Sequence, residues 1–414
     1  MSGPERIGGG TGVDWRTKGF WQPDDAWTAE EFAAARHDLF GGAFTWPVMV
    51  ARRTAIAHNI DTLAAYCVRH GLAFAPHGKS TMAPSLFAAQ LRAGAWGISA
   101  ATANQVLAMR RLGVPRVLLA NELLDPTPLR WLAGEVRHGF EFLCFVDSAD
   151  GVAAIAAAAV DADRPLRVLV ELGHPGGRTG CRTVTELTAV ARAAVAAPGV
   201  ELAGVAGYEG GLSTVDDAAA YLASVRAATL ELAGKGLLGD DVIVTAGGSR
   251  YFDLVPAHLG GAWLPGRALW TVLRSGAYVS HDDGIYRGWT PFRRIPEEGS
   301  LDAALEIWAQ VTSTPEDGLA IVGMGKREAP YDEGLPVPLR VRRRDGTVEP
   351  ARGIEVRRLN DHHTYLGLGP GARLHPGDLV CFGISHPCTA FDKWRVIPVI
   401  EDDYAVTDLI DTYF

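Results

Sequence analysis

One lysine is the residue from which the chemistry of this chain can be argued. Lys79 stands in the segment 74–81 (FAPHGKST), directly after a short apolar run. A lysine in a desolvated pocket with cationic neighbours has a lowered pKa and can form a Schiff base with a carbonyl group. Because Lys79 could equally be a solvated loop charge, its role depends on which other residues reach it.

Short apolar runs alternate with alanine-rich segments of helical spacing and predict the framework that positions Lys79. The strands we expect are residues 72–75, 96–100, 116–120, 142–146, 167–172, 204–208, 242–246 and 270–275. Strands that alternate with amphipathic helices form a parallel sheet, and eight such units match a closed (β/α)₈ barrel. A doubly wound open sheet is the alternative, but the number of units favours closure.

The pattern changes after about residue 296. The β-type runs there are residues 305–312, 319–322, 338–343, 353–356, 364–368, 378–383 and 393–400. No helix separates them, which predicts an antiparallel β domain. We therefore divide the chain into an N-terminal segment, 1–45, that packs on the β domain, a barrel, 46–294, with an extra strand at 46–51, and the β domain, 295–414.

Functional groups of a (β/α)₈ barrel gather in the loops after the strands. The residues that this rule selects are His77, Lys79, Thr102, Asn121, His174, Gly176, Gly177, Arg178, Tyr208, Glu209, Gly247, Gly248, Ser249, Gly276 and Tyr278. The loops after the last two strands often bind a phosphate, and glycine lets backbone donors approach it. A phosphate site across from Lys79 suits pyridoxal phosphate, and it also suits a Schiff-base aldolase that acts on a phosphorylated sugar.

A second group of candidate residues lies in the β domain, at His386-Pro387-Cys388. Positions i and i+2 of a strand face the same way, and imidazole and thiolate are good zinc ligands. Two ligands fall short of the usual three or four, so on the residues alone a buried cysteine beside a turn histidine explains the motif better. The neighbouring segment 361–363 (DHH) could add ligands or form an exposed turn.

Composition excludes several classes of protein. The net charge of −9 is spread over both signs without a basic stripe, which argues against nucleic acid or an anionic membrane as partner. No apolar run approaches the ~20 residues that span a bilayer, and the N-terminus does not have the pattern of a signal peptide. Five cysteines at irregular spacing indicate a reducing compartment. We therefore predict a cytoplasmic location.

Taken together, five motifs resemble a known family. They are PHGK at 76–79, GRTG at 177–180, GYEG at 207–210, GGS at 247–249 and HPC at 386–388. Their order resembles the D-serine dehydratase and D-threonine aldolase group of fold-type III pyridoxal phosphate enzymes, from about residue 45 to the C-terminus. The resemblance implies an alanine-racemase-type barrel followed by a β domain, and a homodimer with sites near the subunit interface.

The resemblance also implies roles for particular residues. Lys79, with His77 beside it, would bind pyridoxal phosphate, and Arg178 and Tyr208 would lie near its ring. The phosphate would be surrounded by Gly247, Gly248, Ser249, Gly276 and Tyr278. His386 and Cys388 would hold a zinc ion that faces the substrate. One departure concerns Thr81, where many relatives have a histidine in a Lys-Thr-His order; a subgroup of amino acid deaminases resembles this chain better.

The His-x-Cys pair resembles the dehydratase branch, whereas the aldolases tend to carry His-x-Asp. We therefore predict a dehydratase or deaminase that removes water from a β-hydroxy D-amino acid, such as D-serine or D-threonine, to give a 2-keto acid and ammonia. The alternative is an aldolase that releases glycine and an aldehyde. A racemase needs a second acid/base for which no candidate is evident, and non-catalytic barrel proteins that bind the cofactor lack the β domain.

The sequence leaves the side chain of the substrate open. Cations that could bind a second carboxylate include Arg52, Arg53, Lys326 and Arg327. Surface charge is the simpler interpretation of each of these residues.

Overall fold

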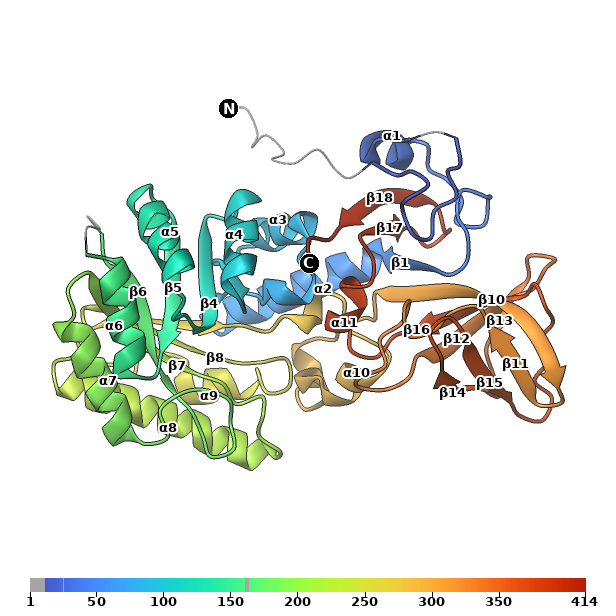
Figure 1. The fold of residues 1–414 in the computed structure, drawn as a ribbon. Coiled ribbons are helices and arrows are strands. Elements are labelled where there is room, and N and C mark those ends of the chain that lie inside the picture. Colours follow the sequence, from blue (N-terminus) through green and yellow to red (C-terminus); the bar gives the residue numbers. More distant parts are fainter. Residues whose placement is uncertain (1–11, 25, 161–163) are drawn as a thin grey trace.

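The computed structural model describes residues 12–24, 26–160 and 164–414, which form two sheets that lie side by side (Figure 1). The first sheet contains β2 (Ala73–Phe74), β3 (Ile98–Ala100), β4 (Arg116–Glu122), β5 (Glu141–Val146), β6 (Leu166–Leu172), β7 (Val200–Gly207), β8 (Asp241–Ala246) and β9 (Ala268–Leu273). Its strand order is β2-β9-β8-β7-β6-β5-β4-β3, and all neighbours run parallel. The predicted parallel eight-stranded sheet is confirmed.

The sheet closes between β2 and β3. The amide of Trp96 donates to the carbonyl of Phe74 at 2.7 Å, and the amide of Ser99 donates to that of Pro76 at 2.9 Å. Inside the barrel the strands bury a column of apolar side chains that includes Leu118, Leu169 and Ile243. Because this column fills the interior, a ligand can enter only at an end of the strands.

Helices cover the outside of the barrel, on the left of Figure 1. They are α2 (Arg53–Arg69), α3 (Pro84–Arg92), α4 (Ala103–Arg111), α5 (Pro126–Arg137), α6 (Ala149–Ala158), α7 (Val184–Ala196), α8 (Val215–Gly234) and α9 (Leu254–Leu259). Five of them begin after a Thr, Ser or Asp whose side chain accepts a hydrogen bond from the first turn: Thr102, Asp125, Ser148, Thr183 and Thr214. Such caps fix where each helix starts, and hence the length of the loop after the strand.

The second sheet is antiparallel except for one strand pair. It contains β1 (Val48–Arg52), β10 (Leu305–Glu316), β11 (Leu319–Val322), β12 (Val337–Arg342), β13 (Val348–Pro350), β14 (Ile354–Leu359), β15 (Thr364–Leu368), β16 (Leu379–Gly383), β17 (Val396–Ile400) and β18 (Val406–Asp411). β1 pairs with β10 and, in parallel, with β17. The extra strand that we assigned to the barrel therefore belongs to this sheet, where its residues 48–51 are completely buried.

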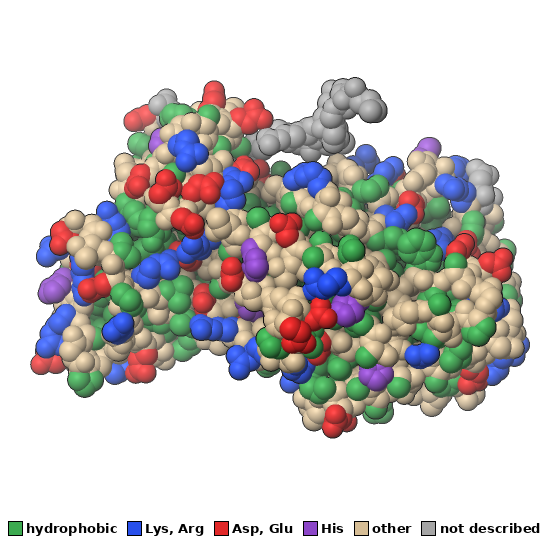
Figure 2. Space-filling view, turned by 180° about the vertical axis from the view of Figure 1, so that it is seen from behind, with side chains coloured by type: hydrophobic (Ala, Val, Ile, Leu, Met, Phe, Trp, Pro, Cys, Tyr) green, Lys and Arg blue, Asp and Glu red, His purple; other side chains and the backbone are tan. Residues whose placement is uncertain are grey.

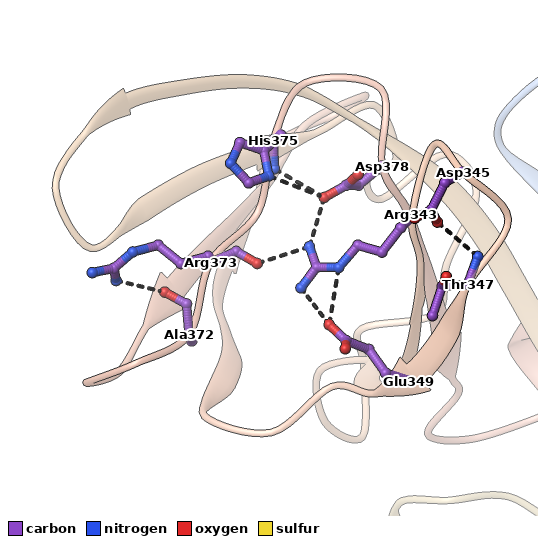
Figure 3. A network of polar contacts seen from close by, with 8 residues as sticks. All are labelled: Arg343, Asp345, Thr347, Glu349, Ala372, Arg373, His375 and Asp378. Atoms are coloured by element: carbon purple, nitrogen blue, oxygen red, sulfur yellow. Dashed lines mark hydrogen bonds and ion pairs between the residues drawn. The ribbon is translucent and has the colours of Figure 1, made fainter.

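The N-terminal segment packs on the second sheet. Phe32 of α1 (Ala29–Ala34), together with Leu39 and Phe44 of the stretch that leads to β1, belongs to the same buried apolar cluster as Trp308 of β10. An arginine network stabilises the far end of this sheet (Figure 3): Arg343 donates to Asp378 Oδ2 at 2.7 Å, to the Arg373 carbonyl at 3.0 Å and to Glu349. The division at residues 45 and 294 stays a prediction.

The surface agrees with the scattered charges of the sequence. Acidic and basic side chains are interspersed on the face shown in Figure 2. Within the described part of the chain, no helix combines the length and apolar character needed to cross a membrane.

Loops from the second sheet meet the carboxyl end of the barrel. The short helices at this junction are η1 (Gly78–Ser80), η2 (Ala277–Val279), α10 (Ile285–Trp289), η3 (Pro291–Arg293), η4 (Pro296–Glu298) and α11 (Cys388–Phe391). The amide of Asp283 donates to the Ile384 carbonyl at 3.1 Å, and Cys388 Sγ lies 3.1 Å from Ser80 Oγ. The second sheet therefore brings its own residues to the end of the barrel that carries Lys79.

Candidate active site

A cavity of about 340 Å³ lies where the barrel strands end and α10 and α11 approach them. This volume is within the range of small-molecule sites. The predicted residues that line it are His77, Lys79, Asn121, Arg178, Tyr208, Gly247, Gly248, Ser249, Gly276 and Cys388. Residues far apart in the sequence thus surround one space, whereas Tyr278 and His386 are not part of its lining.

Lys79 is half-buried on η1, the turn that follows β2. Burial lowers the pKa of Lys79, and the positive charges of Arg178 and Arg274 act in the same direction, whereas the neighbouring Cys388 opposes them. A lowered pKa increases the fraction of neutral amine, which is the form that attacks a carbonyl. The position and the electrostatics of Lys79 therefore suit Schiff-base formation.

His77 follows the first strand of the barrel and Gly276 follows the last, and the two residues lie against each other beside Lys79. A Cβ on Gly276 would lie 2.7 Å from the His77 Cβ, so only glycine permits this approach of the two loops. Burial, with the charges of Lys79 and Arg274, holds the pKa of His77 well below its usual value. Its Nδ1 is buried without a hydrogen-bond partner in the described structure. His77 is thus a neutral imidazole with one polar atom free for a ligand.

Arg178 and Tyr208 lie together at the next part of the wall. The Arg178 guanidinium stands 4.4 Å from the centre of the Tyr208 ring. The loop that carries Arg178 is held by Arg182, whose guanidinium donates to the carbonyls of Gly177, Arg178, Thr179 and Gly180 at 2.7–3.3 Å. Arg178 itself is exposed, but its backbone is therefore anchored.

The glycine loop after β8 differs from our prediction in one respect. We expected the amides of Gly247 and Gly248 to be free for a phosphate. Instead they donate to the carboxylate of Glu209, at 3.0 and 2.6 Å, and Glu209 is completely buried. The carboxylate at the end of β7 reaches the neighbouring loop and fixes its shape, so Ser249 and the backbone around Gly276 remain as candidate donors to an anion.

Two further positions that we singled out in the sequence, Tyr278 and Thr81, lie outside the cavity lining. Tyr278 is buried beside Phe74, and its hydroxyl accepts from Gln90 Nε2 at 2.9 Å, outside the cavity. Thr81, at the position where many relatives have histidine, is also buried. Neither hydroxyl lines the cavity.

The structure adds functional candidates that sequence reasoning missed. Arg274 is buried at the cavity wall, where it donates to Thr245 Oγ1 at 2.8 Å and to the Gly207 carbonyl at 2.7 Å. Tyr286 and Trp289 of α10 also line the cavity. Arg274 directly precedes the loop that we selected, so an arginine at a strand end was an available signal. No periodicity marks α10, because it has five residues.

Two carboxylates on β6 and β4, the strands on either side of β5, form an acidic pair next to the cavity. Glu171 of β6 lines it, is 5% exposed, and has one oxygen without a hydrogen-bond partner among the described residues. Both oxygens of Glu122, at the end of β4, are in the same situation. Burial raises the pKa of Glu122 to about 8, and the charge of Glu171 adds to the effect. Glu122 therefore carries a proton at neutral pH.

His386 and Cys388 come together, but not as we argued. β16 ends at Gly383, His386 has a φ of 66°, and Cys388 begins α11. A left-handed turn, not strand alternation, therefore brings the two side chains close. Hydrogen bonding to Cys388, and to a smaller extent to Asp332, raises the pKa of His386 to about 9, although burial opposes the shift. Among the described residues no cluster of three or more His, Cys, Asp or Glu could hold a metal, and the 361–363 segment does not join the pair.

Comparison with known proteins places this site in a family. The model of the alanine racemase N-terminal domain matches residues 52–271, more than half of the chain, and that of a serine dehydratase domain matches residues 304–400. The chain therefore belongs to the alanine racemase N-terminal domain family, the fold-type III pyridoxal phosphate enzymes.

Its relatives are known by their activities. A 3-hydroxy-D-aspartate aldolase of Paracoccus denitrificans (strain Pd 1222) is 27% identical over 70% of this chain and 74% of that protein. A D-threonine aldolase of Arthrobacter sp is 26% identical over 79% and 81%. The solved D-threonine aldolase from Filomicrobium marinum has the same fold, with a TM-score of 0.74 at 23% identity over 89% of this chain and 94% of that chain. D-threo-3-hydroxyaspartate dehydratase from Delftia sp. HT23 also has this fold, with a TM-score of 0.69 at 23% identity over 89% of this chain and 97% of that chain. The predicted class, a pyridoxal phosphate-dependent lyase, is confirmed.

The cavity fits the cofactor of this family. Lys79 supplies an amine of lowered pKa, and Gly276 leaves room where a side chain would clash. The orphaned Nδ1 of His77 and the hydroxyl of Ser249 are polar groups at the same wall. An amine of lowered pKa, with polar groups and space beside it, suits the carbonyl and the polar groups of pyridoxal phosphate.

Proposed function

We propose that this protein is a dehydratase that eliminates water from a β-hydroxy D-amino acid and releases a 2-keto acid and ammonia. The observation that carries the proposal is the position of Cys388, which lines the cavity of Lys79 and contacts Ser80, the next residue along the chain. A cysteine from the loop after β16 thus lies beside the reactive lysine, and His386 lies close to that cysteine. This arrangement suits a metal ion that acts on a substrate bound at Lys79.

Pyridoxal phosphate supplies an electron sink for the Cα carbanion when bound, and zinc supplies a Lewis acid for the β-hydroxyl. Lys79 would hold the cofactor in a Schiff base until the amino group of the substrate displaces it, and the freed, neutral Nζ of Lys79 would then accept the Cα proton. The Cβ–O bond breaks with its electron pair on oxygen, and that oxygen leaves as water after protonation. The enamine that remains hydrolyses to the keto acid and ammonia.

The side chains around Lys79 would bind and orient the reactants. Arg274 and Arg178 bring positive charge to the cavity and suit anionic groups, and Ser249 and the Gly276 backbone suit the cofactor phosphate. Tyr286 and Trp289 limit access of water from the side of α10. His386 and Cys388 would bind zinc through Nε2 and Sγ, which leaves coordination positions for a substrate.

The second candidate is an aldolase, in which the β-hydroxyl loses its proton and the Cα–Cβ bond breaks. The two curated relatives compared above, at 26–27% identity, favour it because both are aldolases. Cys388 favours elimination, since the aldolases that this chain resembles tend to have aspartate there. Both reactions would use the same lysine and the same two metal ligands, His386 and Cys388.

Product analysis separates the two. Purified enzyme with pyridoxal phosphate and zinc is incubated with D-threonine, and the products are identified. A 2-keto acid with ammonia supports the dehydratase, whereas acetaldehyde with glycine refutes it in favour of the aldolase. D-Serine and 3-hydroxy-D-aspartate follow as further substrates.

Metal removal tests the zinc proposal in the same assay. A chelator should slow the elimination by orders of magnitude, because hydroxide is a poor leaving group without a Lewis acid, and added zinc should restore it. Unchanged turnover after complete removal of zinc would contradict the metal role.

We further propose a homodimer, by resemblance to the family, which light scattering on the purified protein would test.

A further inference from the structure

A carboxylate from a distant loop contacts the ring of His386. Asp332 lies between β11 and β12, more than fifty positions before His386 in the chain, and its Oδ2 is 2.6 Å from His386 Nδ1. Its other oxygen, Oδ1, accepts a hydrogen bond from Thr389 Oγ1 at 2.8 Å. Both oxygens of Asp332 are therefore engaged, and the carboxylate is fixed in direction as well as in position.

The backbone around His386 is held independently of its ring. The amide of His386 donates to Asp282 Oδ2 at 2.8 Å, from the barrel side of the junction. Ser385 Oγ donates to the Glu333 carbonyl at 2.6 Å, which ties the Asp332 loop to the same turn. The turn is thus anchored at its backbone, whereas rotation of the imidazole is limited by Asp332 and by a longer contact of 3.4 Å between Thr389 Oγ1 and Nδ1.

The contact decides which nitrogen of His386 can bind a cation. Because a carboxylate accepts the hydrogen on Nδ1, the lone pair of the neutral ring lies on Nε2. Histidines that bind a metal commonly donate their other N–H to a carboxylate, which fixes the tautomer and increases the basicity of the ligand nitrogen. Asp332 stands in that relation to His386, and Thr389 supports it.

We propose that Asp332 is a positioning residue that orients His386 so that Nε2 and Cys388 Sγ together bind zinc. This inference rests on the proposed function, in which His386 and Cys388 are the protein ligands of the metal. A metal site with two protein ligands depends strongly on the orientation of each ligand, because no third protein ligand helps to hold the ion in place. The alternative is a half-exposed ion pair that stabilises the loop and has no effect on metal binding, since the Asp332 side chain is 44% exposed.

The test is zinc affinity, measured on the cofactor-loaded protein by competition with a chromophoric chelator at constant pH. The Asp332→Ala variant removes the acceptor and should weaken zinc binding 10–100-fold. Asp332→Asn keeps a neutral acceptor and should fall in between. Thr389→Val removes the support of Asp332 and should cost severalfold in affinity.

Asp392→Ala is the matched control. Asp392 ends α11 close to the same site, so its removal also deletes a negative charge near His386 but no hydrogen bond to the ring that the structure records. It should stay within threefold of the unchanged protein. Melting temperatures of the zinc-free proteins show whether a variant loses stability alone.

The outcomes separate this inference from the proposed function. If the unchanged protein binds no zinc, both the metal role and the role of Asp332 are refuted. If it binds zinc, and Asp332→Ala binds zinc equally well with a lower melting temperature, the contact is only structural. If Asp392→Ala loses as much affinity as Asp332→Ala, general charge and not orientation explains the effect, and the positioning role is also refuted.

Discussion

The properties of Lys79 follow from its immediate neighbours. Its amine is half-buried between two guanidinium groups and one thiol, and no hydrogen bond or ion pair of the amine is recorded in the described structure. Burial and positive neighbours both favour the uncharged form, so the lowered pKa has a clear physical cause. The same neighbours would attract an anionic substrate to this amine.

Replacing Lys79 should separate cofactor retention from folding. In Lys79→Ala we expect turnover to fall by about 10³-fold or more, because both the Schiff base and the acid/base group are lost. Reduction with borohydride should fix the cofactor covalently to the unchanged protein but not to the variant, as seen by mass spectrometry. Lys326→Ala, a lysine in a loop of the second sheet, serves as control and should keep both properties. Covalent labelling of Lys79→Ala would show that another lysine binds the cofactor.

Glu122 gives a prediction about pH. Its folded-state pKa is raised to about 8, above the ordinary value of 4.5. Between these values the folded state binds more protons than the unfolded state, so the free energy of unfolding declines as pH rises from about 5 to 8. Glu122→Gln should lessen this decline and be more stable than the unchanged protein at pH 8, by on the order of 1 kcal/mol after allowance for solvent screening.

Urea unfolding at pH 5 and pH 8 measures this effect. Glu141→Gln is the control, because it replaces an exposed glutamate of the adjacent strand β5. Equal pH dependence in the Glu122→Gln variant and the unchanged protein would mean that Glu122 does not hold the proton.

At the scale of elements, loops carry the site and hydrogen bonds within or between them set their shape. Glu209, at the end of β7, binds the amides of the loop after β8, so one carboxylate couples two neighbouring strands. Arg182 does the same within the loop that carries Arg178. The loop positions thus depend on buried or anchored side chains that do not line the cavity.

Arg182→Met should loosen the loop of Arg178 without removing any residue of the cavity lining. Four carbonyl groups lose their donor, and we expect a loss of roughly 1–2 kcal/mol in stability, since exposed carbonyls can bond to water instead. Pyridoxal phosphate should bind severalfold more weakly to the variant, as measured by titration of the cofactor-free protein. The control is Arg192→Met, an exposed arginine on α7. If both variants bind the cofactor equally well, Arg182 has only a local role.

At the scale of the molecule, the second sheet acts as a platform for the turn that carries His386 and Cys388. That turn follows β16, whose strand lies between β10 and β12. The Arg343 network closes the opposite end of the same strands (Figure 3). The metal binding that we propose at the barrel mouth would therefore require a correctly folded second sheet.

The Arg343→Met variant measures what the Arg343 network contributes to the stability of this sheet. The buried carboxylate of Asp378, which is 2% exposed, would lose its charged partner. We expect a loss of about 3 kcal/mol in the free energy of unfolding. Zinc affinity of the protein that remains folded should be unchanged, because the network lies away from the turn. Arg344→Met is the control at the next position, and an equal loss there would contradict the role of Arg343.

The sequence alone determined the framework and part of the cavity lining. Each strand is marked by an apolar run and each turn by a glycine or cap, so all eight barrel strands were predicted within a few residues. Position after a strand then selected Lys79, Arg178 and Ser249, because parallel strands all deliver their loops to one end of a barrel. The strands β13 and β18 were missed; β13 is a short pairing partner of β12, whose pattern is too brief to stand out.

Only the tertiary structure decided which groups satisfy one another. The amides of Gly247 and Gly248 donate hydrogen bonds to Glu209, and the hydroxyl of Tyr278 accepts one from Gln90. Asp332 contacts the ring of a histidine from another loop. The tertiary structure also placed β1 in the second sheet. Local pattern records where a chain is apolar or can turn, because those properties belong to single residues. A hydrogen bond between distant residues depends on the positions of both partners, and folding alone fixes these.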